Sequence, residues 1–170
     1  MANTNSDIYT GQIAHPETLF DSGQLGGRIR AVIGSMSVAA ADFDADGDTI
    51  KLCALPGSAR ITAINIANAD LDTGTDSDVN IGIYTHQGAL IDEDEFGTGS
   101  ALFQASVAQP TQRLGAGLAA SALLLTSTLW ERAGAAADTG VLYDIVLTQT
   151  ATVAGAQVGI VSFVVEYTIS

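Results

Sequence analysis

The stretch QVGIVSFVVEYTIS, residues 157–170, decides how the rest of the chain is interpreted. Every second residue from Val161 onward is apolar, and the residues between them include serine, glutamate and threonine. This alternation has the two-residue period of a β-strand that turns one face to a core and the other to water. The stretches VLYDIVLTQT (141–150) and DVNIGIYT (78–85) repeat it. The sequence therefore predicts an all-β protein.

Shorter runs of the same kind follow from residue 28 onward, separated by Gly, Asp, Asn and Pro. Strands at this spacing predict an antiparallel β-sandwich, jelly-roll-like in character. We assign 28–170 to the sandwich domain and 1–27, which is polar and lacks periodicity, to an extended N-terminal arm. The predicted strands are 29–39, 48–55, 59–67, 79–85, 101–107, 141–150 and 157–169, with 116–124 as a further candidate.

The helical signal is confined to TSTLWERAG, residues 126–134. We expect at most one short helix there, with Thr126 or Ser127 as its N-cap and Gly134 as its stop. Trp130 lies within this segment. A lone tryptophan in a short helix is expected to cover one end of the sandwich core rather than to bind carbohydrate.

The LPGS sequence at 55–58 places Pro56 and Gly57 at the centre of a type II turn. Such a turn needs φ near −60° at its first central residue and a positive φ at its second. The flanking strands, 48–55 and 59–67, are therefore predicted to form a hairpin. A hairpin would bring the loop before it and the loop after it to the same end of the sandwich.

Those two loops are rich in aspartate: the first aspartate loop is 40–48 and the second is 69–80. The first opens like an EF-hand, but Cys53 stands where that calcium loop has a bidentate glutamate, and strands flank it rather than helices. Two interpretations remain: a calcium site of another kind, or solvated turns in which Asp and Gly supply backbone geometry. We favour the turns and expect no cofactor. The ligands of the calcium alternative are Asp42, Asp44, Asp46, Asp48, Asp70 and Asp72.

A third acidic cluster, IDEDEFGTGS at 91–100, is predicted to be a hairpin loop. A pair of carboxylates can hydrolyse glycosides, but we expect such a site in a cleft lined by aromatic rings, and aromatics make up only 6% of this chain. His15 and His86 have no serine or cysteine motif beside them, and no phosphate-binding or dinucleotide-binding glycine motif occurs. We expect no enzyme activity and assign no catalytic residue.

The charge of the chain limits its partners. Nineteen Asp and Glu against six Lys and Arg give a formal net charge of −13, which argues against nucleic acid and against an anionic membrane surface. The single cysteine, Cys53, excludes an internal disulfide, and we interpret it as a half-buried strand residue. No signal-peptide pattern opens the sequence, so synthesis in the cytoplasm is expected.

Two stretches together resemble a known family. GDTIKLCALPGSARITAINIANADLDTGTDSDVNIGIYT (47–85) and LYDIVLTQTATVAGAQVGIVSFVVEYTIS (142–170) combine a Gly-Asp strand start, an LPG turn, an isoleucine-rich strand and a closing hairpin. This order resembles the head decoration or capsid cement proteins of tailed bacteriophages over roughly residues 45–169. The resemblance implies a β-sandwich on the capsid exterior, often a trimer, that ties neighbouring major capsid proteins together. It implies no site residues, because such proteins act by surface complementarity.

Under this interpretation the partners are the major capsid protein and further copies of the chain. The protein would be synthesised in the host cytoplasm and located on the capsid exterior of the virion. The strand at 59–67 supports an oligomer, because Ile61 and Ala63 would lie on one face and Ile64 and Ile66 on the other. Two other functions stay open. One is a phage fibre or lectin-like module that binds glycans, and the other is a tail-tube or tail-terminator subunit.

Overall fold

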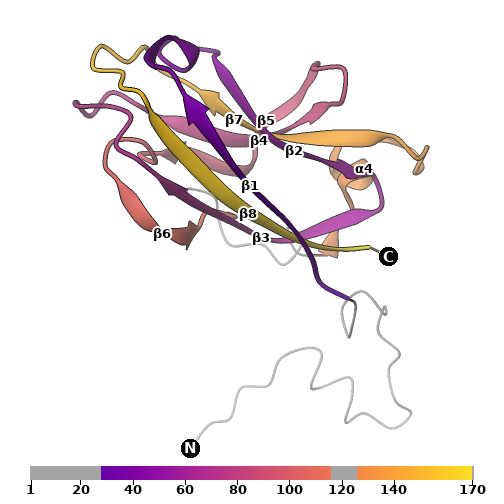
Figure 1. Ribbon diagram of the computed structural model, residues 1–170. Coiled ribbons are helices and arrows are strands. Elements are labelled where there is room, and N and C mark those ends of the chain that lie inside the picture. Colours follow the sequence, from indigo (N-terminus) through magenta and orange to yellow (C-terminus); the bar gives the residue numbers. More distant parts are fainter. Residues whose placement is uncertain (1–27, 116–125, 170) are drawn as a thin grey trace, which may run out of the picture.

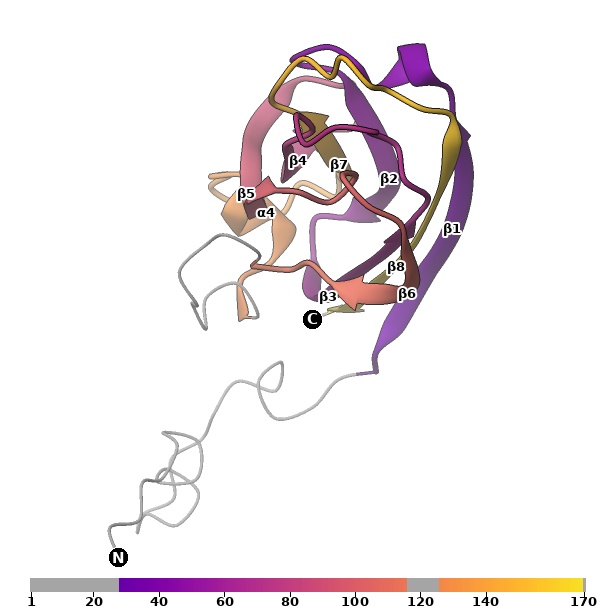
Figure 2. The ribbon, with the colours of Figure 1, turned by 90° about the vertical axis from the view of Figure 1, so that its left-hand side faces the viewer.

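The computed structural model describes residues 28–115 and 126–169 (Figure 1). Within these ranges eight strands form two antiparallel four-stranded sheets packed face to face, which confirms the prediction of an all-β sandwich (Figure 2). No helix in the described residues is long and apolar enough to span a membrane. The expected arm at 1–27, with His15, and the candidate strand at 116–124 lie outside the described residues.

The described strands are β1 Arg30–Val38, β2 Thr49–Pro56, β3 Ala59–Asn68, β4 Val79–Thr85, β5 Leu90–Ser100, β6 Val107–Gln112, β7 Leu142–Gln149 and β8 Gly159–Ile169. The first sheet has the order β1-β8-β3-β6 and the second has the order β2-β7-β4-β5. The pairs β1–β8, β2–β7, β3–β6 and β4–β5 are nested along the chain. The molecule is therefore one long antiparallel hairpin wound into two sheets.

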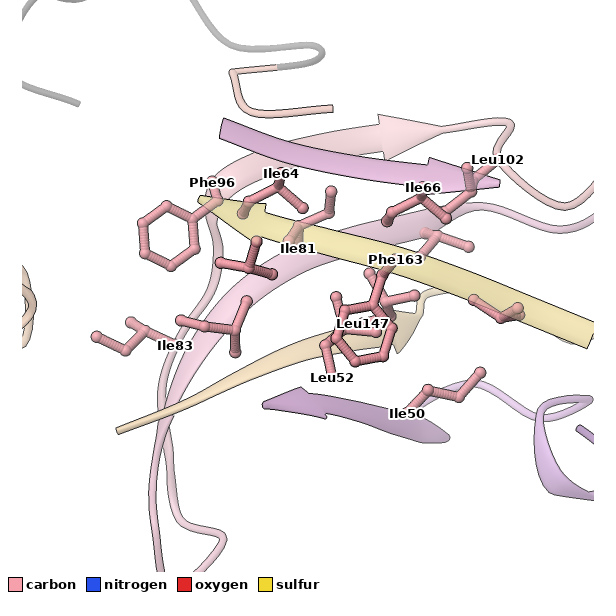
Figure 3. Packing of buried hydrophobic residues seen from close by; sticks show 14 of the residues in the cluster. Ile50, Leu52, Ile64, Ile66, Ile81, Ile83, Phe96, Leu102, Leu147 and Phe163 are labelled. Carbon is pink, nitrogen blue, oxygen red and sulfur yellow. The ribbon is translucent and has the colours of Figure 1, made fainter. Parts of the chain in front are cut away.

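The core lies between the sheets and is formed by the inward residues that the alternation predicted (Figure 3). In β4, Val79, Ile81 and Ile83 are completely buried. In β8, Val161, Phe163 and Val165 are buried in the same way. Removing each such side chain from water contributes about 1.5–3 kcal/mol before conformational entropy is subtracted. This burial orients both sheets and so determines which residues face outward.

β3 corrects the expectation of a strand with two apolar faces. Its pairing with β8 shifts register between Ile61 and Ala63, which leaves one residue unpaired. Because a bulge moves the alternation by one residue, Ile61, Ile64 and Ile66 all point into the core, and each is at most 1% exposed. The isoleucines of β3 therefore provide no argument for an oligomer.

The LPGS segment is a turn, but the predicted hairpin is wrong. β2 pairs with β7 in one sheet, whereas β3 pairs with β8 and β6 in the other, so the chain crosses between sheets at Gly57. Gly57 is not among the glycines with positive φ. It is needed for space, since a Cβ there would lie 2.8 Å from Asp138 Oδ1 and 3.3 Å from the Tyr143 ring.

β5 corrects a second prediction, because the acidic cluster at 91–100 is a strand and not a loop. β5 pairs with β4 at Ile83–Asp92 and again at Ile81–Gly97, so five steps along β5 match two along β4. The excess residues bulge over Gly82, where a Cβ would lie 2.4 Å from the carbonyl oxygen of Asp92. The missing side chain of Gly82 is what allows the bulge to approach.

The strand predicted at 101–107 is also wrong. Residues 101–106 form turns and bends, and β6 begins only at Val107. The apolar residues that suggested a strand, Leu102 and Phe103, are each 1% exposed and fill the core from this irregular segment. Burial alone therefore produced the strand-like pattern.

The predicted short helix is present as α4, Leu129–Arg132, but its N-cap is Thr128. The Glu131 carboxylate accepts hydrogen bonds from the Thr128 N–H at 2.7 Å and from its hydroxyl at 2.6 Å, as a glutamate three residues after the cap does in a capping box. Gly134, with φ of +68°, follows the helix as predicted. Trp130 is half-buried and packs against the core, as expected.

Candidate interaction surface

The two aspartate loops lie at one end of the sandwich, as predicted, and the 150–158 loop joins them. The N–H of Val153 donates to the carbonyl of Asp44 at 2.7 Å. The N–H of Thr150 donates to the carbonyl of Asp78 at 2.8 Å. The loops are thus held together by backbone hydrogen bonds through a third segment rather than by the hairpin that the sequence suggested.

Asp72 is the most deeply buried of the candidate calcium ligands, with 1% of the residue exposed. Its Oδ1 accepts the N–H of Gly74 at 2.8 Å, and its Oδ2 accepts those of Asp76 and Ser77, both at 2.9 Å. Burial alone would raise the pKa of Asp72, but the three backbone hydrogen bonds outweigh it and hold the pKa below its ordinary value. This carboxylate holds the second aspartate loop in shape.

The other candidate ligands with described hydrogen bonds act in the same way. Asp48 Oδ2 accepts the N–H groups of Asp44 and Ala45 at 3.1 and 2.8 Å, while Asp42 and Asp70 each accept one backbone N–H. Among residues 28–115 and 126–169, no His, Cys, Asp or Glu side chains form a group of three or more that could hold a metal ion. This geometry favours the solvated-turn interpretation, and calcium binding stays a prediction of the alternative.

An ionic cluster on the outer side of the second sheet was not predicted. Asp144 in β7 has a side chain only 5% exposed, and its two oxygens contact Lys51 Nζ at 2.9 Å and His86 Nδ1 at 2.8 Å. Burial acts to raise the pKa of Asp144, but the hydrogen bonds and charges of His86 and Lys51 lower it overall. The cluster joins β2, β7 and the turn after β4. Its members are 58 and 93 residues apart, so no local pattern could reveal it.

Replacing Lys51 by Met should lower the free energy of unfolding by about 1 kcal/mol at pH 7, because buried Asp144 then keeps only His86. The exposed methylenes of Lys51 are retained by Met, so the loss reports on the charge. Urea unfolding measures it. In the Asp144→Asn background the same Lys51→Met change should cost almost nothing, and an equal loss in both backgrounds would contradict the pairing.

Acid should destabilise the protein. The pKa values of Asp72, Asp144 and Glu131 are lowered in the folded chain, so their stabilisation is present above pH 4 to 5 and is lost as pH falls through the folded pKa values. Asp94 acts in the opposite direction, because its hydrogen bond to Asp92, its burial and the nearby charges of Asp92 and Glu93 raise its pKa. Because three groups have a lowered pKa and one has a raised pKa, we expect the free energy of unfolding to fall as the pH is lowered. Urea titrations from pH 7 to pH 3 measure it, and constant stability over that range would refute it.

The outer side of the first sheet carries exposed isoleucines among small and hydroxyl side chains, and it has few charges. We call it the β1–β8 face and define it by the outward residues of β1, β8 and β3. Paired across the strands, they form rows such as Ile33–Val164–Asn65 and Ser35–Ser162–Ala67. Ile33 is 76% exposed, and Ile160 in the row beyond is 57% exposed. The full set is Ala31, Ile33, Ser35, Ser37, Ile160, Ser162, Val164, Glu166, Thr168, Arg60, Ala63, Asn65 and Ala67.

Comparison with solved structures finds the same sandwich in phages. The chain matches one in the cyanophage Pam1 capsid asymmetric unit over 100% of both chains, with a TM-score of 0.54 and 19% identity. It matches one in the capsid of Ralstonia phage GP4 over 85% of this chain and 86% of that one, with a TM-score of 0.61 and 18% identity. The fold is one that phage capsids contain. No protein-family model matches the chain, and no curated protein matches it either.

At these identities the likeness is one of fold. A sandwich of this kind offers two broad sheet faces and two ends of loops to its surroundings. In this chain those surfaces differ in chemistry: the aspartate loops form an acidic end, the second sheet carries ionic side chains, and the β1–β8 face is apolar.

Proposed function

We propose that this protein is a structural component of a phage virion that binds the outer surface of the capsid and stabilises contacts between major capsid proteins. The observation that carries the proposal is the match over the full length of both chains to a chain of a solved phage capsid. The nested pairing of the eight strands is the order expected of a jelly roll, and it supports the proposal because viral capsid proteins are among those that use that fold. The resemblance of residues 45–169 to cement and decoration proteins supports the exterior position.

The proposed partners are the major capsid protein and further copies of this chain, as a trimer. The charge distribution favours different binding surfaces for the major capsid protein and for further copies of this chain. Within the strand bounds, the second sheet carries Lys51 against five acidic residues, and the aspartate loops add more negative charge at one end. Such surfaces suit basic groups of another protein and repel a second copy of this one.

The proposal assigns no catalytic role. Cys53 is half-buried, and burial together with the charge of Asp144 raises the pKa of its thiol to about 12, so the thiol is protonated at neutral pH. His86 is held by Asp144, a structural pair already explained by the packing of β7. The function we propose therefore rests on surface contacts alone.

Binding to capsid shells tests the proposal directly. Purified protein is mixed with expanded shells of the major capsid protein from the same phage, and the shells are sedimented. We expect saturable binding at a fixed ratio to the shell subunits, and a higher temperature for shell disruption. An unrelated protein of similar size and net charge serves as the control. A folded chain that does not sediment with shells would overturn the proposal.

A glycan-binding module is the alternative that the fold itself permits, since lectin domains also use jelly rolls. Trp130, the one tryptophan that could stack on a sugar ring, is half-buried and packs against the core, which disfavours this alternative. A glycan array with and without a calcium chelator distinguishes the two, because capsid binding needs no sugar. Saturable, sugar-specific binding without any binding to shells would favour the module.

A further inference from the structure

We propose that the β1–β8 face is where this chain binds further copies of itself. The inference deepens the oligomer that is part of the proposed function, by assigning a surface to it. It rests on three properties of this face: concentrated apolar exposure, an unprotected strand edge, and few charged groups on a molecule that is otherwise strongly acidic.

Exposed apolar side chains are concentrated here. The described residues include eight large hydrophobic side chains that are exposed, and five of them belong to β1 or β8 or directly precede one of these strands. Between them the face has small residues, alanine and serine, so that a flat surface can approach closely. Clustered exposure of this kind marks interaction sites, whereas single exposed apolar residues need no explanation. The five are Ile29, Ile33, Val158, Ile160 and Ile169, of which the first four have the outward parity of their strands and Ile169 has the inward one.

β1 is also an edge strand without the features that normally protect an edge. It pairs with β8 without interruption from Arg30–Tyr167 to Val38–Gly159, with no bulge. It contains no proline, and its only charged residue is Arg30 at its start. Within the described residues nothing pairs with its other side, which lies at the rim of the sandwich (Figure 2). A flat apolar edge of nine residues is a template for pairing with another chain.

The distribution of charge indicates which partner binds the β1–β8 face. Inside the strand bounds the first sheet carries Arg30, Arg60 and Glu166, a net charge of +1, whereas the second sheet carries one base and five acids, a net charge of −4. The whole chain has a net charge of −13. Two copies therefore repel through most of their surfaces, and the β1–β8 face, where Glu166 is the one carboxylate, is the place where they can meet with the least repulsion.

Residues close to a symmetry axis lie near their own copies, whereas farther from a threefold axis one part of a face contacts a different part of the next chain. Three chains with their β1–β8 faces turned to a threefold axis would cover Ile33 and Ile160 and leave the acidic second sheets outside. The same arrangement gives the proposed trimer one apolar centre and an acidic periphery for the capsid protein.

Cysteine cross-linking tests the geometry. The Ile33→Cys variant, mildly oxidised, should form a cross-linked pair on a non-reducing gel. Thr75→Cys is the matched control, because Thr75 is equally exposed but lies in the second aspartate loop at the acidic end. Cys53 contributes little background, since its thiol has a pKa of about 12. Cross-links in Thr75→Cys with none in Ile33→Cys would overturn the inference.

The mass of the protein in solution tests whether the β1–β8 face stabilises an oligomer. Wild-type protein should be an oligomer by sedimentation equilibrium, and the Ile33→Glu/Ile160→Glu variant should dissociate with a constant raised about 100-fold or more, because two carboxylates would be desolvated. Both positions are exposed, so the variant should keep the wild-type circular dichroism spectrum, which shows that it is still folded. A monomeric wild-type chain, or a variant that stays assembled, would refute this role of the face.

Shell sedimentation of the same variants separates this inference from the proposed function. A cross-linked, oligomeric wild-type chain that does not bind shells supports the inference while the capsid role fails. A wild-type chain that is monomeric but loses shell binding on Ile33→Glu overturns the inference, because the face would then contact the capsid protein instead.

Discussion

The Phe96→Ala variant should lose about 3–5 kcal/mol of its free energy of unfolding, among the largest losses we expect from any single core substitution. Phe96 lies in the bulged part of β5 and is completely buried. Its ring also makes a cation–π contact, since the Arg132 guanidinium lies 5.5 Å from the ring centroid. The same guanidinium forms an ion pair with Glu95. Truncation leaves a cavity and removes the aromatic face beneath this guanidinium.

Urea unfolding followed by the fluorescence of Trp130, which lies in α4 beside Arg132, measures the loss of Phe96. Leu90→Ala is the matched control, because Leu90 is a large apolar residue of the same strand but is 55% exposed. That variant should change stability by less than about 0.5 kcal/mol. Equal losses in the two variants would mean that β5 is not anchored to the core through Phe96.

The contrast between Phe96 and its surroundings explains why the sequence did not reveal β5. The sequence around it, IDEDEFGTGS, is acidic and glycine-rich, which is the composition of a loop. β5 is nevertheless a strand because it pairs along β4 at the edge of the second sheet, and its bulge depends on the space above Gly82. Pairing and close approach are properties of the partner strand, and no local pattern in β5 records them.

Where a strand has one buried face, the sequence was sufficient. β1, β2, β3 and β8 begin and end within two residues of their predicted bounds, because burial of alternate residues is visible in the pattern. The bounds of β4 and β7 were predicted equally well, although both of these strands are buried on both faces. The sequence was less successful in predicting how those strands pair. The turn at Gly57 serves a crossing between sheets, and the bulge after Ile61 reverses the faces of the residues that follow it.

The candidate surfaces show the same division. The sequence correctly predicted that the two aspartate loops lie at one end of the sandwich. It did not predict that the 150–158 loop, rather than a hairpin, holds them there. The β1–β8 face was missed: Ile33 and Ile160 are visible in the sequence, but only the register with Val164 and Ser37 shows that they share an outward face. The sequence pattern instead indicated β3 as the strand that contacts another copy, but the isoleucines of β3 are buried in the core.

The Asp72→Ala variant should lose about 2–4 kcal/mol, because three backbone N–H groups beside a buried carboxylate would lose their acceptor. Asp70→Ala is the control, since Asp70 is exposed and accepts one N–H group at 3.2 Å, and it should lose less than about 1 kcal/mol. Urea unfolding at pH 7 measures both variants. Similar small losses in the two would show that the hydrogen bonds of Asp72 do not hold the loop.

The same measurement with calcium and with EDTA decides between the two interpretations of the aspartate loops. If the carboxylates shape turns, wild-type protein should unfold at the same urea concentration in both conditions, and the loss in Asp72→Ala should be independent of calcium. If the six aspartates hold an ion, calcium should stabilise the wild type, and Asp72→Ala should remove that gain. We expect no dependence on calcium, because Asp72 already directs both of its oxygens to backbone N–H groups.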